Sequence, residues 1–252
     1  MTDTPADKAT DPWARLRAAT PARIGLGRVG AGLPTAAQME FQFAHARARD
    51  AVHTPLDVAA LTAELEDLAP ITVTSDAPDR TTYLRRPDLG RRLAEADLPE
   101  TGADVVFILA DGLSSAALAA HGANVLRATL PKLDGLSIAP PVIATQARVA
   151  LGDAIAAQMK ARLVVTLIGE RPGLTVADSL GAYITYGAKP GTPDSLRNCI
   201  SNIHGRGGLT PDLAAHKIAW LVREALSRKL TGTGLKENAG LPAPAPAPKL
   251  QD

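Results

Sequence analysis

The sequence predicts an α/β protein in which a mostly parallel sheet is flanked by helices and preceded by a smaller, mainly helical N-terminal region. Two observations carry this prediction. From residue 104 onward, short apolar runs alternate with longer segments of helical periodicity, a pattern typical of parallel sheets covered by helices. Two of these runs, 104–110 and 162–169, are almost wholly apolar, as expected of strands buried on both faces.

The region before residue 101 reads mainly as helix. Residues 35–52 have apolar side chains at roughly helical spacing. Residues 83–94 are basic and interrupted by Pro87, which indicates an exposed arm or a broken helix. The other expected elements are a disordered tail over 1–11, a short helix over 11–20 capped by Asp11, a glycine-rich segment over 22–35, a helix over 56–69 and a strand over 71–75.

Residues 101–236 contain the alternating elements of the predicted sheet. The last helix is expected to begin after Thr210, because a threonine followed by proline is typical of an N-cap and the first helical position. The expected strands cover 104–110, 136–144, 162–169, 180–187 and 197–203, and the expected helices cover 114–128, 145–160 and 211–230. Residues 237–252 are rich in proline and alanine, so we expect an extended, disordered tail.

Composition argues against several classes of function. A net charge of +1 and an aromatic content of 3% disfavour a nucleic-acid-binding protein. A single cysteine excludes an internal disulfide and a cysteine-based metal site, and it indicates a reducing, cytoplasmic location. No run approaches the roughly 20 apolar residues of a membrane span. We therefore expect a soluble cytoplasmic protein with no membrane partner.

Gly25, Gly27 and Gly30 form a GxGxxG motif, which in a strand–turn–helix context binds the pyrophosphate of a dinucleotide. Here a short helix and Pro21 precede it, and no acidic residue ends a second strand about 20 residues further on. A tight interface loop is the better interpretation, and a nucleotide-dependent oxidoreductase remains the alternative. The sequence also lacks the GxSxG, Walker A and HExxH motifs, so we predict no catalytic residues.

Two further segments have both a functional and a structural interpretation. Asp111 to Ser115 follows a strong strand and either binds an anion at a helix N-terminus or forms a turn capped by serine; the turn is favoured. His204 lies in an NxHxxG segment without a carboxylate to orient its imidazole, so we expect a hydrogen-bonded structural histidine and no metal site.

Glu170 is the sharpest candidate for ligand binding. It follows a buried strand and is flanked by Gly169 and Arg171. Its carboxylate either accepts hydrogen bonds from the amides of a ligand or forms an ion pair with a loop arginine, and the residues alone leave both open. Cys199, in a strand, reads as a buried small hydrophobic residue with no nucleophilic arrangement around it.

Seven segments together resemble the small subunit of ethanolamine ammonia-lyase, in the right order and from about residue 12 to 236. They are ARIGLGRVGAGLPT, FAHARARDAVHTPLD, APDRTTYLRRPDLGRRL, DVVFILADGLSS, QARVALGD, IGERPGLTVADSLGAYITY and RNCISNIHGRGG. The resemblance implies an adenosylcobalamin-dependent lyase that converts ethanolamine to acetaldehyde and ammonia by a radical mechanism. It places the substrate site on a large barrel subunit and assigns the small subunit a Rossmann-like domain that helps to hold the cobalamin.

The resemblance also implies roles for particular parts of this chain. Residues 101–236 would form the cobalamin-binding domain, with Val149, Glu170 and Cys199 as cofactor contacts, and residues 12–100 would contact the large subunit. Six copies of each subunit, and enclosure in an ethanolamine-utilisation microcompartment, are further expectations. The remaining alternative is a non-catalytic scaffold that binds a partner through its basic arm at residues 80–92.

Overall fold

The computed structural model describes residues 12–20, 22–27 and 32–240. The tails predicted over 1–11 and beyond residue 240, as well as Asp11 and Gly30, lie outside this range. The chain divides into two compact units at Arg47/Ala48. The first unit contains helix α1 (Ala14–Ala19) and most of α2 (Thr35–His53), which agrees with the helix predicted over 35–52.

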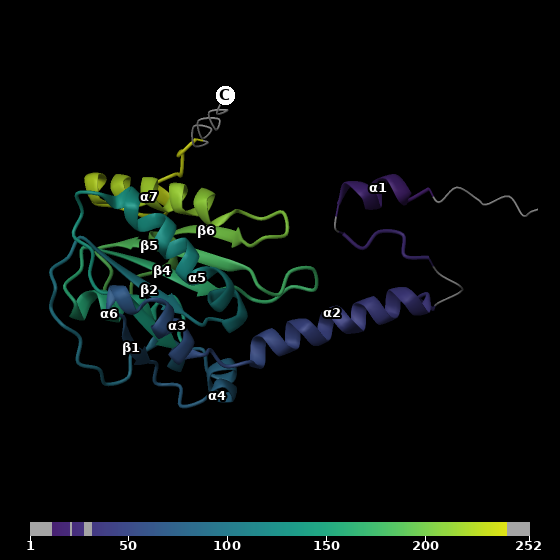
Figure 1. Ribbon diagram of the computed structural model, residues 1–252, viewed down its shortest axis with the longest axis horizontal. Helices are drawn as coiled ribbons and strands as arrows, with labels where there is room; N and C mark the ends of the chain where they lie inside the picture. Colours follow the sequence, from purple (N-terminus) through teal and green to yellow (C-terminus); the bar gives the residue numbers. More distant parts are fainter. Residues whose placement is uncertain (1–11, 21, 28–31, 241–252) are drawn as a thin grey trace, which may run out of the picture. The chain divides into compact units, whose positions relative to one another are not determined.

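The second unit is built on a six-stranded sheet with helices on both faces (Figure 1), which confirms the α/β class. Its strands are β1 (Ile71–Thr74), β2 (Val105–Ala110), β3 (Val142–Thr145), β4 (Leu163–Gly169), β5 (Leu180–Tyr186) and β6 (Asn198–Ile203). Its helices are α3 (Val58–Glu64), α4 (Arg80–Arg85), α5 (Ser115–Thr129), α6 (Leu151–Gln158) and α7 (Pro211–Arg228).

The sheet has the order β1-β3-β2-β4-β5-β6 and is mixed. Pairs β1–β3, β3–β2 and β2–β4 are parallel, whereas β4–β5 and β5–β6 are antiparallel. A parallel return requires a crossover of a dozen or more residues, usually a helix. Residues 170–179 join β4 to β5 without a helix, so the chain turns back and β5 runs antiparallel.

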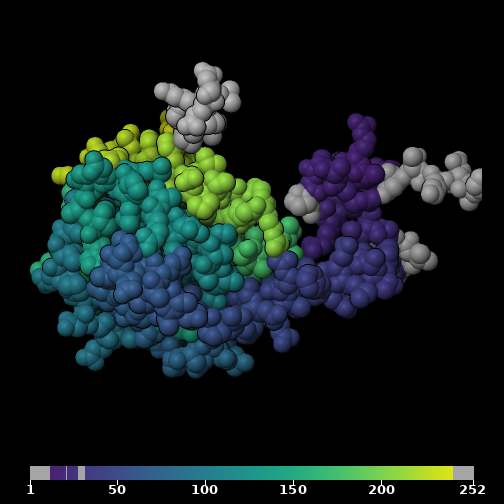
Figure 2. All heavy atoms as spheres, viewed as in Figure 1, coloured from purple at the N-terminus to yellow at the C-terminus, as the bar shows by residue number. Residues whose placement is uncertain are grey.

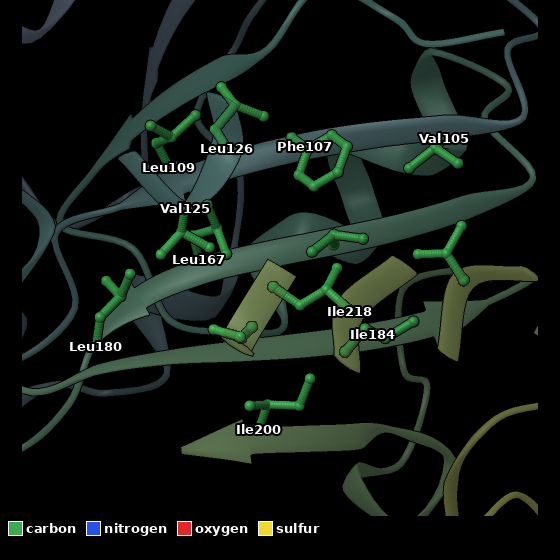
Figure 3. Close-up of a cluster of buried hydrophobic side chains, with 14 of the residues drawn as sticks. Val105, Phe107, Leu109, Val125, Leu126, Leu167, Leu180, Ile184, Ile200 and Ile218 are labelled. Carbon is green, nitrogen blue, oxygen red and sulfur yellow. The ribbon is translucent and has the colours of Figure 1, made fainter. Parts of the chain in front are cut away.

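One face of the sheet is covered by α3, α5 and α7. Alternate residues of β2, including Val105, Phe107 and Leu109, point to this face together with residues of β4, β5 and β6. Figure 3 shows these strand residues packed against Val125 and Leu126 of α5 and Ile218 of α7. In the space-filling view, atoms of α5 and α7 cover this side of the sheet (Figure 2).

The opposite face has a second core, in which Val106 and Ile108 of β2 pack against Leu151 and Ile155 of α6. Helix α6 covers β2, β3 and β4 but leaves the antiparallel end of the sheet open. On this face of β5 and β6, Tyr183 is half-buried and Cys199 is exposed. The open part of this face, over β5 and β6, is called the open face below.

The caps of the long helices follow the predicted chemistry. The Ser114 hydroxyl accepts a hydrogen bond from the Ala117 amide at 3.2 Å at the start of α5. The Thr210 hydroxyl accepts from the Leu213 amide at 3.3 Å at the start of α7, with Pro211 in the first position. The turn interpretation of residues 111–115 and the predicted start of α7 are therefore confirmed.

In the region before residue 101, the division of the chain differs from the prediction, and one of the two interpretations of the basic segment is confirmed. Strand β1 pairs with β3, so residues from Ala48 onward belong to the unit that contains the sheet, and the division of the chain lies well before residue 100. The basic segment is a broken helix, because α4 ends at Arg85 and Pro87 separates it from a short 3-10 turn. It is not an exposed arm, since Tyr83 is completely buried.

Candidate functional site

The carboxyl ends of three parallel strands lie at one edge of the sheet. β2, β3 and β4 continue directly into Asp111, Gln146 and Glu170. The loop after β2 leads to α5 on one face, and the loop after β3 leads to α6 on the other. In α/β sheets, a point where successive loops diverge to opposite faces is where ligands bind.

The Glu170 carboxylate is held by one of its two oxygens. Oε2 accepts a hydrogen bond from the Ser179 hydroxyl at 2.6 Å and from the Asn202 amide at 3.3 Å. Oε1 accepts no hydrogen bond from any described residue, and no described arginine or lysine forms an ion pair with Glu170. The side chain is thus fixed in place with one oxygen left to accept a hydrogen bond from a ligand.

A β-bulge and a glycine set the position of this carboxylate. The register of β5 and β6 shifts between the pairs Leu180–Ile203 and Ala182–Ile200. Within the shift, Asn202 has φ +60°, and this left-handed conformation directs its amide to Glu170. Gly181 lies beneath the carboxylate, since a Cβ there would be 3.0 Å from Oε1. A larger residue at position 181 would displace Glu170.

Cys199 and Tyr183 are cross-strand partners on the open face, next to Glu170. The prediction that Cys199 is buried is wrong: the residue is exposed, because no described helix covers β6 on this side. Desolvation raises the pKa of its thiol, a hydrogen bond with Tyr183 opposes this, and the nearby Glu170 carboxylate adds to the rise. The thiol is therefore neutral at physiological pH and unsuited to act as a nucleophile.

Tyr183 shares the environment of Cys199. Desolvation is the main cause that raises the pKa of its phenol, with further contributions from Cys199 and Glu170. Its ring supplies apolar surface, and its hydroxyl stays protonated as a hydrogen-bond donor.

Val149 lies in the turn before α6. It is half-buried and packs against the same apolar cluster as Tyr183. The structure therefore brings Glu170, Tyr183 and Cys199 together and places Val149 on the same side of the sheet. Tyr183 was missed by the sequence analysis, although its pairing with Cys199 follows once the hairpin register of β5 and β6 is known.

A second group of residues next to the site was also missed. The buried Asp111 carboxylate pairs with Arg80 at 3.2 Å and accepts hydrogen bonds from the amides of Gln146 at 2.9 Å and Ala147 at 3.0 Å. The Tyr83 hydroxyl donates to the Ala147 carbonyl at 2.9 Å. These contacts hold residues 146–150 as a turn, so α6 begins at Leu151 and not near residue 145 as predicted.

Two other predicted sites have structural roles. The imidazole Nδ1 of the buried His204 accepts a hydrogen bond from the Arg206 amide at 3.1 Å, which is the structural role expected for it. In the glycine motif, the Arg17 guanidinium donates to the Gly25 carbonyl at 2.7 Å, and Gly25, with φ +54°, packs against Trp13. No strand precedes this loop within residues 22–27, and the next described helix begins at Thr35.

Among the described residues, no group of three or more histidine, cysteine, aspartate or glutamate side chains is placed to hold a metal ion. Within the described parts of the chain, none of the helices is both long and apolar enough to cross a membrane.

The fold and site define an α/β protein in which a fixed carboxylate, a protonated phenol and a small thiol lie on an open sheet face, with no nucleophile and base paired among them. Residues 10–236 match the family described as "Ethanolamine ammonia-lyase light chain (EutC)". The chain therefore belongs to this family, in agreement with the resemblance seen in its sequence.

Curated relatives bear the same designation. The chain is 50% identical over 245 residues to the ethanolamine ammonia-lyase small subunit of Rhodopseudomonas palustris (strain BisA53), covering 93% of this chain and 94% of that protein. It is 50% identical over 244 residues to that of Bradyrhizobium diazoefficiens, covering 92% and 93%. It is 48% identical over 252 residues to that of Xanthomonas campestris pv. campestris (strain ATCC 33913), covering 95% and 92%.

Proposed function

We propose that this chain is the small subunit of an adenosylcobalamin-dependent ethanolamine ammonia-lyase and that it helps to hold the cobalamin at its interface with the large subunit. Family membership and the names of the relatives support the first part. The single observation that best supports the second is the Glu170 carboxylate, fixed through Oε2 and free at Oε1.

The residues of the open face fit a corrin. The rim of a cobalamin is lined with neutral amides around an apolar macrocycle, so a protein surface for it needs hydrogen-bond acceptors beside apolar contacts. Oε1 of Glu170 supplies an acceptor, and Val149 and Tyr183 supply apolar surface. The small side chain of Cys199, exposed on the strand, permits close approach of a large planar group.

The chain's own task in this proposal is to bind and to orient. When bound, adenosylcobalamin supplies the radical chemistry that starts the elimination. Cys199 keeps its proton, and among the described residues the Glu170 carboxylate accepts hydrogen bonds only from Ser179 and Asn202. Neither is therefore placed to transfer a proton to or from a substrate, and we assign the substrate site to the large subunit.

Contact with the large subunit is assigned to the N-terminal region. Helix α2 carries Met39 at 63%, Phe41 at 41% and Phe43 at 65% exposure, and large exposed apolar side chains clustered on one helix mark protein interfaces.

We include in the proposal an assembly of six copies of each subunit. Enclosure in a microcompartment stays a prediction. The oxidoreductase alternative is weakened because no strand precedes Gly25 and Gly27 within residues 12–20 and 22–27.

Co-expression with the large subunit tests the proposal. The assembled pair should bind adenosylcobalamin, observed by its absorbance, and form acetaldehyde from ethanolamine. Glu170→Ala should raise the Kd for the cofactor about tenfold, the cost of one hydrogen bond to a charged group, with assembly unchanged. Glu95→Ala, which changes an exposed carboxylate elsewhere, is the matched control. Full cofactor binding and activity by the large subunit alone would overturn the proposal.

A further inference from the structure

Two guanidinium groups share one buried aromatic ring beside the candidate site. The guanidinium carbons of Arg80 and Arg148 lie 4.9 Å and 4.4 Å from the centroid of the Tyr83 ring. The charged groups that act on the Tyr83 hydroxyl are these two arginines and Asp111. Two positive charges thus face a single negative one, which leaves one positive charge without a partner in this cluster.

Arg80 is the arginine that is neutralised. Besides its pairing with Asp111 at 3.2 Å, it donates to the Gly112 carbonyl at 2.9 Å and to the Val52 carbonyl at 2.7 Å. The Asp111 carboxylate also accepts hydrogen bonds from two backbone amides, so both of its oxygens are already paired within the cluster. The surplus charge therefore belongs to Arg148.

The Arg148 side chain is held in place but has no partner for its charge. Its guanidinium forms no hydrogen bond or ion pair with any described residue, and its Nε is buried. Its backbone amide donates to the Gly90 carbonyl at 2.8 Å. A Cβ at Gly90 would lie 2.8 Å from the Tyr83 ring and 3.0 Å from Cγ of Arg148, so the arginine stem is closely packed. The Arg148 side chain is thus closely packed, although no acceptor among the described residues pairs with its guanidinium.

Two neighbouring polar atoms are also buried without a hydrogen-bond partner, namely Nη2 of Arg80 and Oε1 of Gln146. The neutral amide of Gln146 can satisfy one donor by rotating, but it carries no charge to balance Arg148. Arg148 is half-buried, and leaving its buried Nε–H without an acceptor costs free energy. A bound anion removes that cost.

We propose that Arg148 binds the phosphodiester of the nucleotide tail of adenosylcobalamin. This inference rests on the proposed function. The phosphodiester is the only anionic group of the cofactor, and its single charge matches the single surplus charge of the cluster. The planar fork of an arginine suits two phosphate oxygens. Arg148 is also adjacent in sequence to Val149, which we assign to the cofactor, and both precede α6.

The test uses the assembled two-subunit protein and two ligands, adenosylcobalamin and adenosylcobinamide, which lacks the nucleotide tail and its phosphodiester. Arg148→Gln should raise the Kd for adenosylcobalamin about tenfold to hundredfold, as expected for the loss of a charge-assisted hydrogen bond. The Kd for adenosylcobinamide should stay unchanged. Arg148→Lys should fall between wild type and the glutamine variant. Arg228→Gln, at an exposed arginine of α7 on the opposite face of the sheet, should match wild type.

Glu170→Ala is a second control with a different expected pattern. Because it removes a contact to an amide that both ligands carry, it should raise the Kd for adenosylcobalamin and for adenosylcobinamide by the same factor. As a second measurement, the Kd for adenosylcobalamin should depend less steeply on ionic strength in Arg148→Gln than in wild type or in Glu170→Ala. This measurement applies even where the tailless ligand binds too weakly to quantify.

Three results would overturn the inference: equal weakening of both ligands by Arg148→Gln, an unchanged Kd together with an unchanged salt dependence, or an unchanged Kd with weaker subunit assembly. The last would assign Arg148 to a carboxylate of the large subunit. Failure of the proposed function is distinct, since the wild-type assembly would then bind neither ligand.

Discussion

Removing the negative charge of Asp153 is expected to destabilise the protein strongly, because Asp153 and Arg197 form a buried, bidentate ion pair. Nη1 and Nη2 of Arg197 lie 2.6 Å and 2.8 Å from the two carboxylate oxygens of Asp153. The side chains are only 2% and 1% exposed. The pair joins α6, which contains Asp153, to the segment that leads into β6.

The magnitude follows from the buried guanidinium of Arg197, which the substitution leaves with only the exposed carboxylate of Asp194 as a charged partner. In Asp153→Asn the guanidinium of Arg197 stays buried, with Thr185, the Thr192 carbonyl and Asp194 as its remaining partners. Breaking a buried pair from one side typically costs about 3–5 kcal/mol of unfolding free energy. For a protein of this size, this corresponds to a fall in Tm of roughly 6–20 °C.

Thermal and urea unfolding of the full-length chain, followed by circular dichroism, measures this effect. The matched control is Asp88→Asn, which breaks the exposed pair with Arg86 and should leave Tm nearly unchanged. Replacing both partners, as in Asp153→Leu with Arg197→Met, should recover a large part of the loss because no buried charge remains. If Asp153→Asn were no more destabilising than Asp88→Asn, the argument from burial would be refuted.

Two further predictions concern the open face. Gly181→Ala should weaken adenosylcobalamin binding by the assembled subunits, though less than Glu170→Ala, because its Cβ would lie 3.0 Å from Oε1 and shift the Glu170 carboxylate. The control Gly205→Ala, where no atom lies near the added Cβ and φ is not positive, should leave the affinity unchanged. Equal effects of Gly181→Ala and Gly205→Ala would contradict this role. Since desolvation raises the pKa of Cys199 above that of an ordinary thiol, its alkylation by iodoacetamide should be slow at neutral pH and accelerate only at alkaline pH. The cofactor should suppress the alkylation, as mass spectrometry would show. Rapid labelling at pH 7 would refute the raised pKa.

The local pattern of the sequence was sufficient for most strands and helix boundaries, whereas the strand predicted over 136–144 is confined to Val142–Thr145. Strands such as β2 and β4 are recognisable because burial on both faces leaves a continuous apolar run. Thr210 and Pro211 mark the start of α7 through local hydrogen bonding alone. Glu170 was identified for a similar reason, since it directly follows a buried strand.

Features that depend on distant parts of the chain were not predictable in this way. Whether Cys199 is covered depends on which strands carry a crossover helix, and no pattern within β6 contains that information. The cluster around Tyr83 joins residues 64 positions apart, as in the hydrogen bond from Tyr83 to Ala147. The sequence does not show that the turn at 146–150 lies beside the basic residues near Tyr83. From the sequence alone, these residues are therefore interpreted as solvent-exposed.

The direction of β5 accounts for the openness of the site. A parallel return from β4 would require a crossover helix packed on one face of the sheet. The direct connection through residues 170–179 supplies Ser179 to hold Glu170 and adds no helix above Tyr183 and Cys199. The antiparallel hairpin then places the β-bulge of Asn202 opposite the same carboxylate. The strand direction that makes the sheet mixed thus both builds the carboxylate site and leaves it accessible to a large ligand or a second subunit.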